Sequence, residues 1–438
     1  MENKINPSRR KVLLGGLALG AVASTVFLKP GDHGKNHSDY FKSLSSALNK
    51  VELARPTLVI DKQILLQNIK ELSGFINQQY DYRIVGKSLP SLPLIELVMD
   101  KAKTNRLMMF HEPFLSQVAL KVPKSDVLMG KPMPVVAAMN FYNTMANHSR
   151  ARGGFEVEHQ LQWLIDTQER LIQYRDLAKQ LNVKMNINIE LDVGLHRGGV
   201  EDTQQLHDML RLIQNEPLLT FSGLMGYEPH VAAVPGDKIA HRDAAMKIYR
   251  EQLLMAQQVM ASDLSHLTLN AAGSPTYRYY SKDKANADED FPHNELSAGS
   301  CLVKPLDFDL AILKDHQAAC FIATPVVKTM NQTQLPGVDG LGKMMSMWDQ
   351  NRERAFFTYG GYWKSQAVSP EGLSLNPIFG RSTNQEMYNG SATIDLRPDD
   401  WLFLRPTQSE FVFLQFGDIA VYDNGEITEF WPVFNAAA

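Results

Sequence analysis

The stretch MNINIELDVGLHRGG, at residues 185–199, contains a strand pattern followed by a glycine-rich turn. Residues 185–191 form a strand-like apolar run, and the glycines after it are typical of the turn that ends a strand. A second apolar set then follows the 3.6-residue period of a helix and shares one face: Leu206, Met209, Leu210 and Ile213. The stretch therefore belongs to a strand–turn–helix unit.

The same alternation recurs on both sides of this unit. Further strand-like runs lie at 57–60, 83–87, 107–110, 126–129, 221–225 and 267–270. Repeated strand–helix units predict a parallel sheet covered by helices. Residues 55–304 have the length of a (β/α)8 barrel, and no Gly-rich dinucleotide motif follows the first strand. The sequence therefore predicts an α/β fold that begins with a (β/α)8 barrel.

After residue 304 the helical periodicity fades. Short β-rich runs separated by Gly, Pro and Asn appear at 320–329, 355–359, 401–404, 411–416 and 419–422. We expect residues 305–438 to form a smaller, mainly β C-terminal domain.

Composition restricts the possible partners. Lys and Arg number 44 against 48 Asp and Glu, for a net charge of −4, and no long basic block occurs. Nucleic acid is therefore not an expected partner. The two cysteines, Cys301 and Cys320, are too few for a disulfide scaffold or a thiolate zinc site, and whether they pair stays open. No run in the body is long enough to span a bilayer, so no membrane association is expected of the mature form.

The N-terminus resembles an export signal. Arg9-Arg10-Lys11 precedes an uncharged stretch, and Ala21-Val22-Ala23 has the small residues of a cleavage site. Residues 1–28 are interpreted as a twin-arginine-type signal and residues 29–54 as a linker. We expect recognition by the twin-arginine export machinery and a periplasmic location; an uncleaved anchor helix is the alternative.

Reactive side chains lie at several predicted strand ends, where barrels place their active sites. Lys87 ends an apolar run, and a lysine held against apolar surroundings can act as a nucleophile toward aldehydes. Residues 190–199 and 221–230 combine acidic, basic and glycine residues. The small-residue loop at 269–277 could cradle a phosphate with its backbone N–H groups.

The order of these motifs resembles a known family. The motifs are PTLVID at 56–61, the strand-end Lys87, DVGLHRGGV at 192–200, GYEPH at 226–230 and GSPT at 273–276. Together they resemble the pyridoxal-phosphate enzymes with an alanine-racemase-type barrel, in the D-threonine aldolase / D-serine dehydratase-like branch. The resemblance continues to the C-terminus through DGLGK at 339–343 and EFWPV at 429–433. It implies pyridoxal 5'-phosphate, a small D-amino acid substrate and a homodimer.

The resemblance also assigns roles to individual residues. Lys87 matches the lysine that binds the cofactor covalently, and Arg197 and Tyr227 match cofactor-contacting positions. In the phosphate loop, the matching positions are Gly273, Ser274 and Thr276. His230 is a candidate for substrate contact or proton transfer, with a structural, turn-stabilising role as the equal alternative.

The chain departs from the family at the metal site. Members that act on D-3-hydroxy amino acids carry a C-terminal His-x-Cys or His-x-Asp pair, where this sequence has Gln408 and Glu410. A neutral amide is a poor ligand and one carboxylate holds a hard cation weakly, so a divalent metal is not expected. The alternative is a weak oxygen-only site that adds Asp418 or Glu386 to Glu410.

Three functions remain open from the sequence. The first is a pyridoxal-phosphate lyase of the aldolase or dehydratase type. The second is a metal-independent racemase or deaminase, and the third is a cofactor- or amino-acid-binding protein without turnover. The G-x-x-x-x-G-K spacing at 337–343 is not interpreted as a nucleotide site, because Met344 replaces the required Ser or Thr.

Export can be tested through the arginine pair. We expect cleavage of the signal near Ala23. We also expect the double variant Arg9→Lys, Arg10→Lys to block export, because the receptor of the twin-arginine machinery reads the guanidinium pair. Fractionation and N-terminal sequencing would measure both effects, with Lys11→Arg as the control that keeps the pair. Unimpaired export of the double variant would contradict a twin-arginine route.

Overall fold

A computed structural model describes residues 29–76, 79–148, 154–281, 291–334, 337–338 and 340–435. The chain divides into two compact units. The barrel unit comprises Thr57–Phe321 and the segment from Pro406 onward, and the β unit comprises the segment up to Pro56 and Ile322–Arg405. This division differs from the expected domains, since the last segment of the chain belongs with the barrel. The predicted export signal at 1–28 lies outside the described residues.

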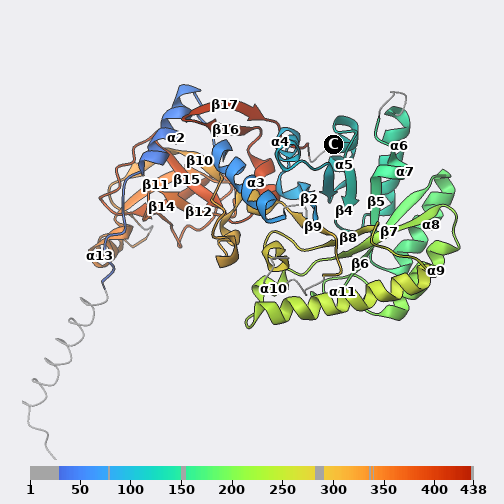
Figure 1. Cartoon of the computed structure of the whole chain (residues 1–438). Coiled ribbons are helices and arrows are strands. Elements are labelled where there is room, and N and C mark those ends of the chain that lie inside the picture. Colours follow the sequence, from blue (N-terminus) through green and yellow to red (C-terminus); the bar gives the residue numbers. More distant parts are fainter. Residues whose placement is uncertain are drawn as a thin grey trace, which may run out of the picture. The chain divides into compact units, whose positions relative to one another are not determined.

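Eight parallel strands close into a barrel, which confirms the predicted fold class (Figure 1). The strands are β2 (Asp81–Val85), β3 (Arg106–Met109), β4 (Asp126–Met129), β5 (Leu161–Ile165), β6 (Met185–Leu191), β7 (Leu219–Gly226), β8 (Thr268–Ala271) and β9 (Glu295–Ala298). All neighbours pair in parallel, including β2 with β9. Because the strands are parallel, their carboxyl ends lie on one rim.

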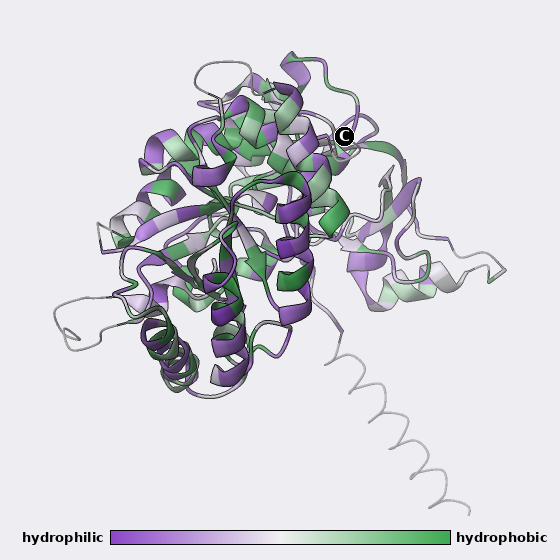
Figure 2. Ribbon diagram, turned by 90° about the vertical axis from the view of Figure 1, so that its right-hand side faces the viewer, coloured by the Kyte–Doolittle hydropathy of each residue, from purple (hydrophilic) through white to green (hydrophobic). Residues whose placement is uncertain are grey.

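Helices surround the barrel strands. They are α3 (Lys62–Ile76), α4 (Leu92–Ala102), α5 (Glu112–Lys121), α6 (Val135–His148), α7 (Val157–Gln160), α8 (Gln168–Leu181), α9 (Thr203–Gln214), α10 (His230–Ala233), α11 (Lys238–Met260) and α12 (Ser300–Val303). In Figure 2 the longer helices alternate between hydrophobic and hydrophilic residues, as amphipathic helices do. The predicted face of α9, from Leu206 to Ile213, is buried. The side chain of Asp202 caps that helix by accepting a hydrogen bond from Gln205 N at 2.8 Å.

The strand predicted at the start of the barrel lies outside it. β1 (Thr57–Asp61) pairs in parallel with β16 (Ile419–Asp423), and β16 pairs antiparallel with β17 (Glu426–Trp431). The prediction failed because a buried apolar strand looks the same in either sheet. The segment predicted as a strand at 411–416 is also different: Glu410–Gln415 forms a 3-10 helix, η7.

The β unit is mainly antiparallel. Its strands are β10 (Cys320–Met330), β11 (Arg354–Tyr359), β12 (Ser365–Ser369), β13 (Ser374–Leu375), β14 (Gln385–Gly390) and β15 (Trp401–Pro406). The part of β10 that belongs to this unit begins at Ile322. β10 pairs antiparallel with both β11 and β15, and β14 pairs with β11 and β13. The unit also contains α13 (Leu341–Trp348) and α2 (Asp39–Lys50), so part of the expected linker at 29–54 is helical. The mainly β character of the second domain is confirmed.

None of the helices in the described part of the chain combines the length and apolarity needed to cross a lipid bilayer. Both cysteines lie among the described residues, and they are buried thiols rather than a disulfide.

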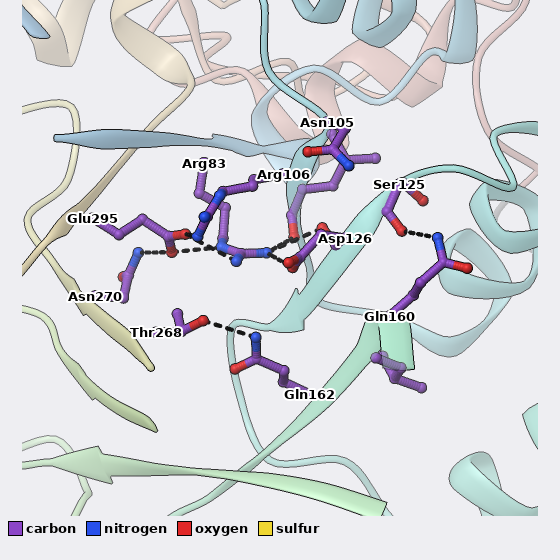
Figure 3. Close-up of polar contacts among 12 residues, drawn as sticks. Arg83, Asn105, Arg106, Ser125, Asp126, Gln160, Gln162, Thr268, Asn270 and Glu295 are labelled. Atoms are coloured by element: carbon purple, nitrogen blue, oxygen red, sulfur yellow. Dashed lines mark hydrogen bonds and ion pairs between the residues drawn. The ribbon is translucent and has the colours of Figure 1, made fainter. Parts of the chain in front are cut away.

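A charge network with a buried centre, Arg83 and Glu295, lies near the beginning of the barrel strands (Figure 3). The Arg83 guanidinium, which has no exposed surface, donates from Nε to Glu295 Oε1 at 2.6 Å and from Nη1 to Asp126 Oδ1 at 2.8 Å. Arg106 Nη1 and Asn270 Nδ2 also donate to the Glu295 carboxylate, at 2.7 and 2.8 Å. Five strands, β2, β3, β4, β8 and β9, are joined through these side chains.

Glu295 keeps its charge in this environment. Burial alone would raise the pKa of Glu295, but the charges and hydrogen bonds of Arg83 and Arg106 outweigh it and lower the pKa below its usual value. A carboxylate whose pKa is lower in the folded state stabilises the fold above its unfolded-state pKa of about 4.3, and this contribution is lost as pH falls through the folded-state value.

We expect Glu295→Gln to lower the free energy of unfolding by about 3–5 kcal/mol at pH 7, because Arg83 is left buried without its main counter-charge. The difference from wild type should shrink as the pH falls below about 4. Urea denaturation at several pH values would measure it. Glu371→Gln, which breaks the exposed Lys35–Glu371 pair, is the matched control and should cost at most about 1 kcal/mol. An equal loss of unfolding free energy in both variants would contradict the conclusion that the Arg83–Glu295 network stabilises the fold.

Candidate active site

A pocket opens at the carboxyl ends of the barrel strands, within the barrel unit. The space that it encloses measures about 100 Å³. Its apolar wall is formed by Val85, Met108, Phe110, Met225, Pro275 and Phe308. Its polar lining includes Lys87, Arg197, Tyr227, Asn270, Ser274 and Glu410. The pocket brings together residues from the ends of β2, β6, β7 and β8.

Lys87 is placed as predicted, directly after β2 in a short 3-10 turn (Gly86–Ser88). Its Nζ lies 2.9 Å from Glu410 Oε1 and 4.8 Å from the ring centroid of Phe110. The amine therefore lies in the pocket between a carboxylate and an aromatic face. Both groups favour a cation.

Arg197 and Tyr227 also reach the pocket. The Arg197 guanidinium carbon lies 5.1 Å from the centre of the Tyr227 ring. Burial raises the pKa of Tyr227 to about 12, although the Arg197 charge opposes the shift. The phenol is therefore protonated at neutral pH and able to donate a hydrogen bond.

The 272–276 loop approaches the pocket closely at Gly273. A Cβ at this position would lie 2.6 Å from Tyr227 Cε2, so only glycine lets the loop backbone approach the tyrosine ring. Ser274 Oγ accepts hydrogen bonds from Gly299 N at 3.0 Å and Cys301 N at 3.1 Å. Its hydroxyl ties this loop to the segment after β9.

Thr276 is not brought to the pocket. Its hydroxyl donates to Glu228 Oε1 at 2.8 Å and accepts from Gly273 N at 3.1 Å, while Ala272 N donates to Glu228 Oε2 at 3.2 Å. Two of the N–H groups expected to cradle a phosphate are thus bonded within the protein.

Glu228 is a residue of the site that was not expected from the sequence. It is fully buried, and it positions the whole 272–276 loop against the end of β7. Burial raises the pKa of its carboxyl, against the hydrogen bond from Thr276. The signal available in the sequence was its place inside the GYEPH motif, beside Tyr227.

His230 lies beside the pocket and is not one of its lining residues. Its Nε2 is 3.3 Å from the position that a Cβ on Gly194 would occupy, so the DVGLHRGGV and GYEPH motifs meet here. Burial lowers the pKa of His230, helped by the nearby His241, which keeps the imidazole neutral at neutral pH. In the described structure its Nδ1 is buried without a hydrogen-bond partner.

Glu190 is a second acidic residue near the site that was not expected there from the sequence. It lies near the end of β6, where burial and the charges of Asp166 and Asp192 raise its pKa to about 7, against the opposing charge of Arg197. The charge beside Arg197 therefore changes near neutral pH.

The positions expected to bind a metal in the family are used differently. Gln408 Nε2 donates to Asp307 Oδ2 at 2.9 Å, and Glu410 pairs with Lys87. Glu386, in the β unit, is bonded by Arg381 at 2.6 Å. Within the described ranges, no group of three or more His, Cys, Asp or Glu residues could hold a metal ion. The expectation of a weak or absent metal site stays a prediction.

The lining residues fit pyridoxal phosphate. The group needs an amine for its aldehyde, polar contacts for its ring and a small-residue backbone for its phosphate. Lys87 supplies the amine, and Arg197 and Tyr227 supply the polar groups. Gly273 lets the loop backbone come close, because a Cβ at this position would occupy the space beside Tyr227. Ser274 Oγ, with its two backbone donors, can still donate its own proton.

Comparison of sequences identifies one related family. Residues 147–303 match the family described as "Alanine racemase, N-terminal domain". The comparison with curated proteins found no match to this sequence.

Several solved structures share the fold. D-threonine aldolase from Filomicrobium marinum is 14% identical, covers 86% of this chain and 94% of its own, and has a TM-score of 0.67. D-threo-3-hydroxyaspartate dehydratase from Delftia sp. HT23 is 13% identical, with 88% and 98% coverage and a TM-score of 0.65. Alanine racemase from Bacillus anthracis is 14% identical, with 87% and 98% coverage and a TM-score of 0.62. The predicted resemblance is confirmed: this chain matches the alanine racemase N-terminal domain over residues 147–303 and shares its fold with D-threonine aldolase and D-threo-3-hydroxyaspartate dehydratase.

Proposed function

We propose that this protein is a pyridoxal-phosphate-dependent enzyme that acts on a small D-amino acid as a lyase of the aldolase or dehydratase type. The observation that carries the proposal is the position of Lys87 Nζ, in a pocket that Arg197, Tyr227 and the 272–275 backbone also line. The fold shared with D-threonine aldolase, D-threo-3-hydroxyaspartate dehydratase and alanine racemase supports a pyridoxal-phosphate enzyme, and the motif order of the sequence supports the lyase branch.

Each residue of the pocket has its own role in the proposed reaction. When bound, the cofactor would supply an electron sink for negative charge at the substrate Cα. Lys87 Nζ is the nucleophile for its aldehyde and the amine of the described pocket lining that would move a proton at Cα. The protonated Tyr227 hydroxyl would donate a hydrogen bond to the bound molecule, and the Arg197 guanidinium over the Tyr227 ring would orient the tyrosine. The apolar wall of Met108, Phe110 and Phe308 excludes water from the reacting atoms.

A metal-independent racemase or deaminase is the second candidate. The observation that favours it is the donor set at Gln408 and Glu410, where an amide and an ion-paired carboxylate replace good metal ligands. A protein that binds cofactor and amino acid without turnover is the third. A panel of D-amino acids with product analysis separates the three.

Two further properties are proposed from the sequence. A homodimer is proposed from the family resemblance. Twin-arginine export to the periplasm is proposed from the sequence of residues 1–28.

We expect purified protein to be yellow and Lys87→Ala to lose the covalently bound cofactor while keeping its fold. Borohydride reduction followed by peptide mapping should place the cofactor on Lys87, and circular dichroism would report the fold. Lys62→Ala, which removes an exposed ion pair with Glu429, is the control and should stay yellow. Reduced cofactor on another lysine would contradict the assignment.

We expect stoichiometric pyridoxal phosphate but no tightly bound Zn²⁺ or Mn²⁺, because a catalytic divalent site normally needs two or three good protein donors. Elemental analysis of protein purified without chelator, followed by assays with chelator and added metals, measures this. Gln408→His combined with Glu410→Asp restores the family's ligand types and should raise metal affinity. One equivalent of metal in the wild type, with activity lost on chelation, would show that Glu410 binds metal.

A further inference from the structure

Glu410 is the one carboxylate among the described residues that line the pocket. The other charged groups of the lining are Lys87 and Arg197, and the rest of the wall mixes apolar with uncharged polar side chains. Glu410 is therefore the group of the described lining that can attract a positive group on a bound molecule and repel a negative one.

The backbone holds Glu410 in an uncommon conformation. Its φ is +55°, in the left-handed region that non-glycine residues adopt at an energetic cost. Neighbouring contacts maintain it: Asp307 N donates to Thr407 O at 2.9 Å, and Val412 N donates to Ser409 O at 3.2 Å, with Ser409 buried. The backbone that carries Glu410 is thus held by the fold at the edge of the pocket.

The position of Lys87 Nζ shows what this part of the pocket accepts. The amine lies 2.9 Å from Glu410 Oε1 and 4.8 Å from the Phe110 ring centroid. A carboxylate and an aromatic face together recognise an ammonium group. In the proposed function the Lys87 nitrogen is engaged with the cofactor aldehyde, and Glu410 can then accept a hydrogen bond from another donor.

We propose that Glu410 determines substrate specificity: it favours a D-amino acid whose short side chain ends in an ammonium or hydroxyl donor and rejects one that ends in a carboxylate. This inference rests on the proposed function. A second carboxylate beside Glu410 would be repelled in a partly desolvated pocket, whereas a donor replaces the lost contact with Lys87.

Three amino acids of similar length test the order of preference. D-2,3-diaminopropionate, D-serine and D-aspartate differ at the group attached to Cβ. Dissociation constants measured from the absorbance of the cofactor-loaded protein should increase in that order, with D-aspartate at least about tenfold weaker than D-serine. Glu410→Gln should reduce that ratio by about tenfold by improving D-aspartate binding, while Glu251→Gln, on an exposed position of α11, should not change it. A preference for D-aspartate in the wild type, or an unchanged ratio in Glu410→Gln, would overturn the proposal.

A cofactor-free experiment separates this inference from the proposed function. In Lys87→Ala, methylammonium chloride should replace the missing amine between Glu410 and Phe110 and raise the Tm saturably, relative to sodium chloride. The rise should vanish in Lys87→Ala combined with Glu410→Gln. No rise in Lys87→Ala, in a protein that does bind cofactor at Lys87, overturns the inference and leaves the proposed function intact. A rise that depends on Glu410, in a protein that never binds cofactor, supports the cation position and overturns the proposed function.

Discussion

Closure of eight parallel strands into a barrel is the constraint on which the site depends. Because every strand runs in the same direction, the carboxyl ends of β2, β6, β7 and β8 meet on one rim, and residues far apart in sequence line one pocket. Closure also buries side chains inside the barrel, where charge must be paired. Arg83 and Glu295 satisfy this requirement while joining the last strand, β9, to the first, β2.

The rim is organised in two levels. Lys87, Arg197 and Tyr227 face the pocket, while Glu228 and Thr276 lie behind it and are fully buried. Glu228 holds the 272–276 loop through a backbone N–H and a hydroxyl, so the shape presented to a ligand depends on a residue that does not line the pocket. The chemistry proposed for Lys87 therefore depends on packing beneath it.

Positions 408 and 410 shape the charge of the pocket. A divalent metal was not expected at these two positions, and in the structure Gln408 bonds to Asp307 while Glu410 pairs with Lys87. A pocket that carries an anion here favours donors on a substrate and disfavours acids. The proposed reaction class follows from Lys87 and its neighbours, whereas the proposed choice of substrate follows from Glu410.

The sequence by itself determined the barrel and its β-rich second domain, because strand period and helix period are local properties. The motif order, through the resemblance that it carries, also pointed to Lys87, Arg197, Tyr227 and Gly273, which the structure brings to one pocket. It missed β5 and β9, and it placed residues 57–60 in the barrel, since short apolar strands do not reveal their sheet. Only the tertiary structure decided that Thr276 bonds to Glu228, that His230 lies beside the pocket and that Glu410 reaches Lys87. Each of these depends on contacts between residues that are distant in the chain, and such contacts form only when the barrel closes.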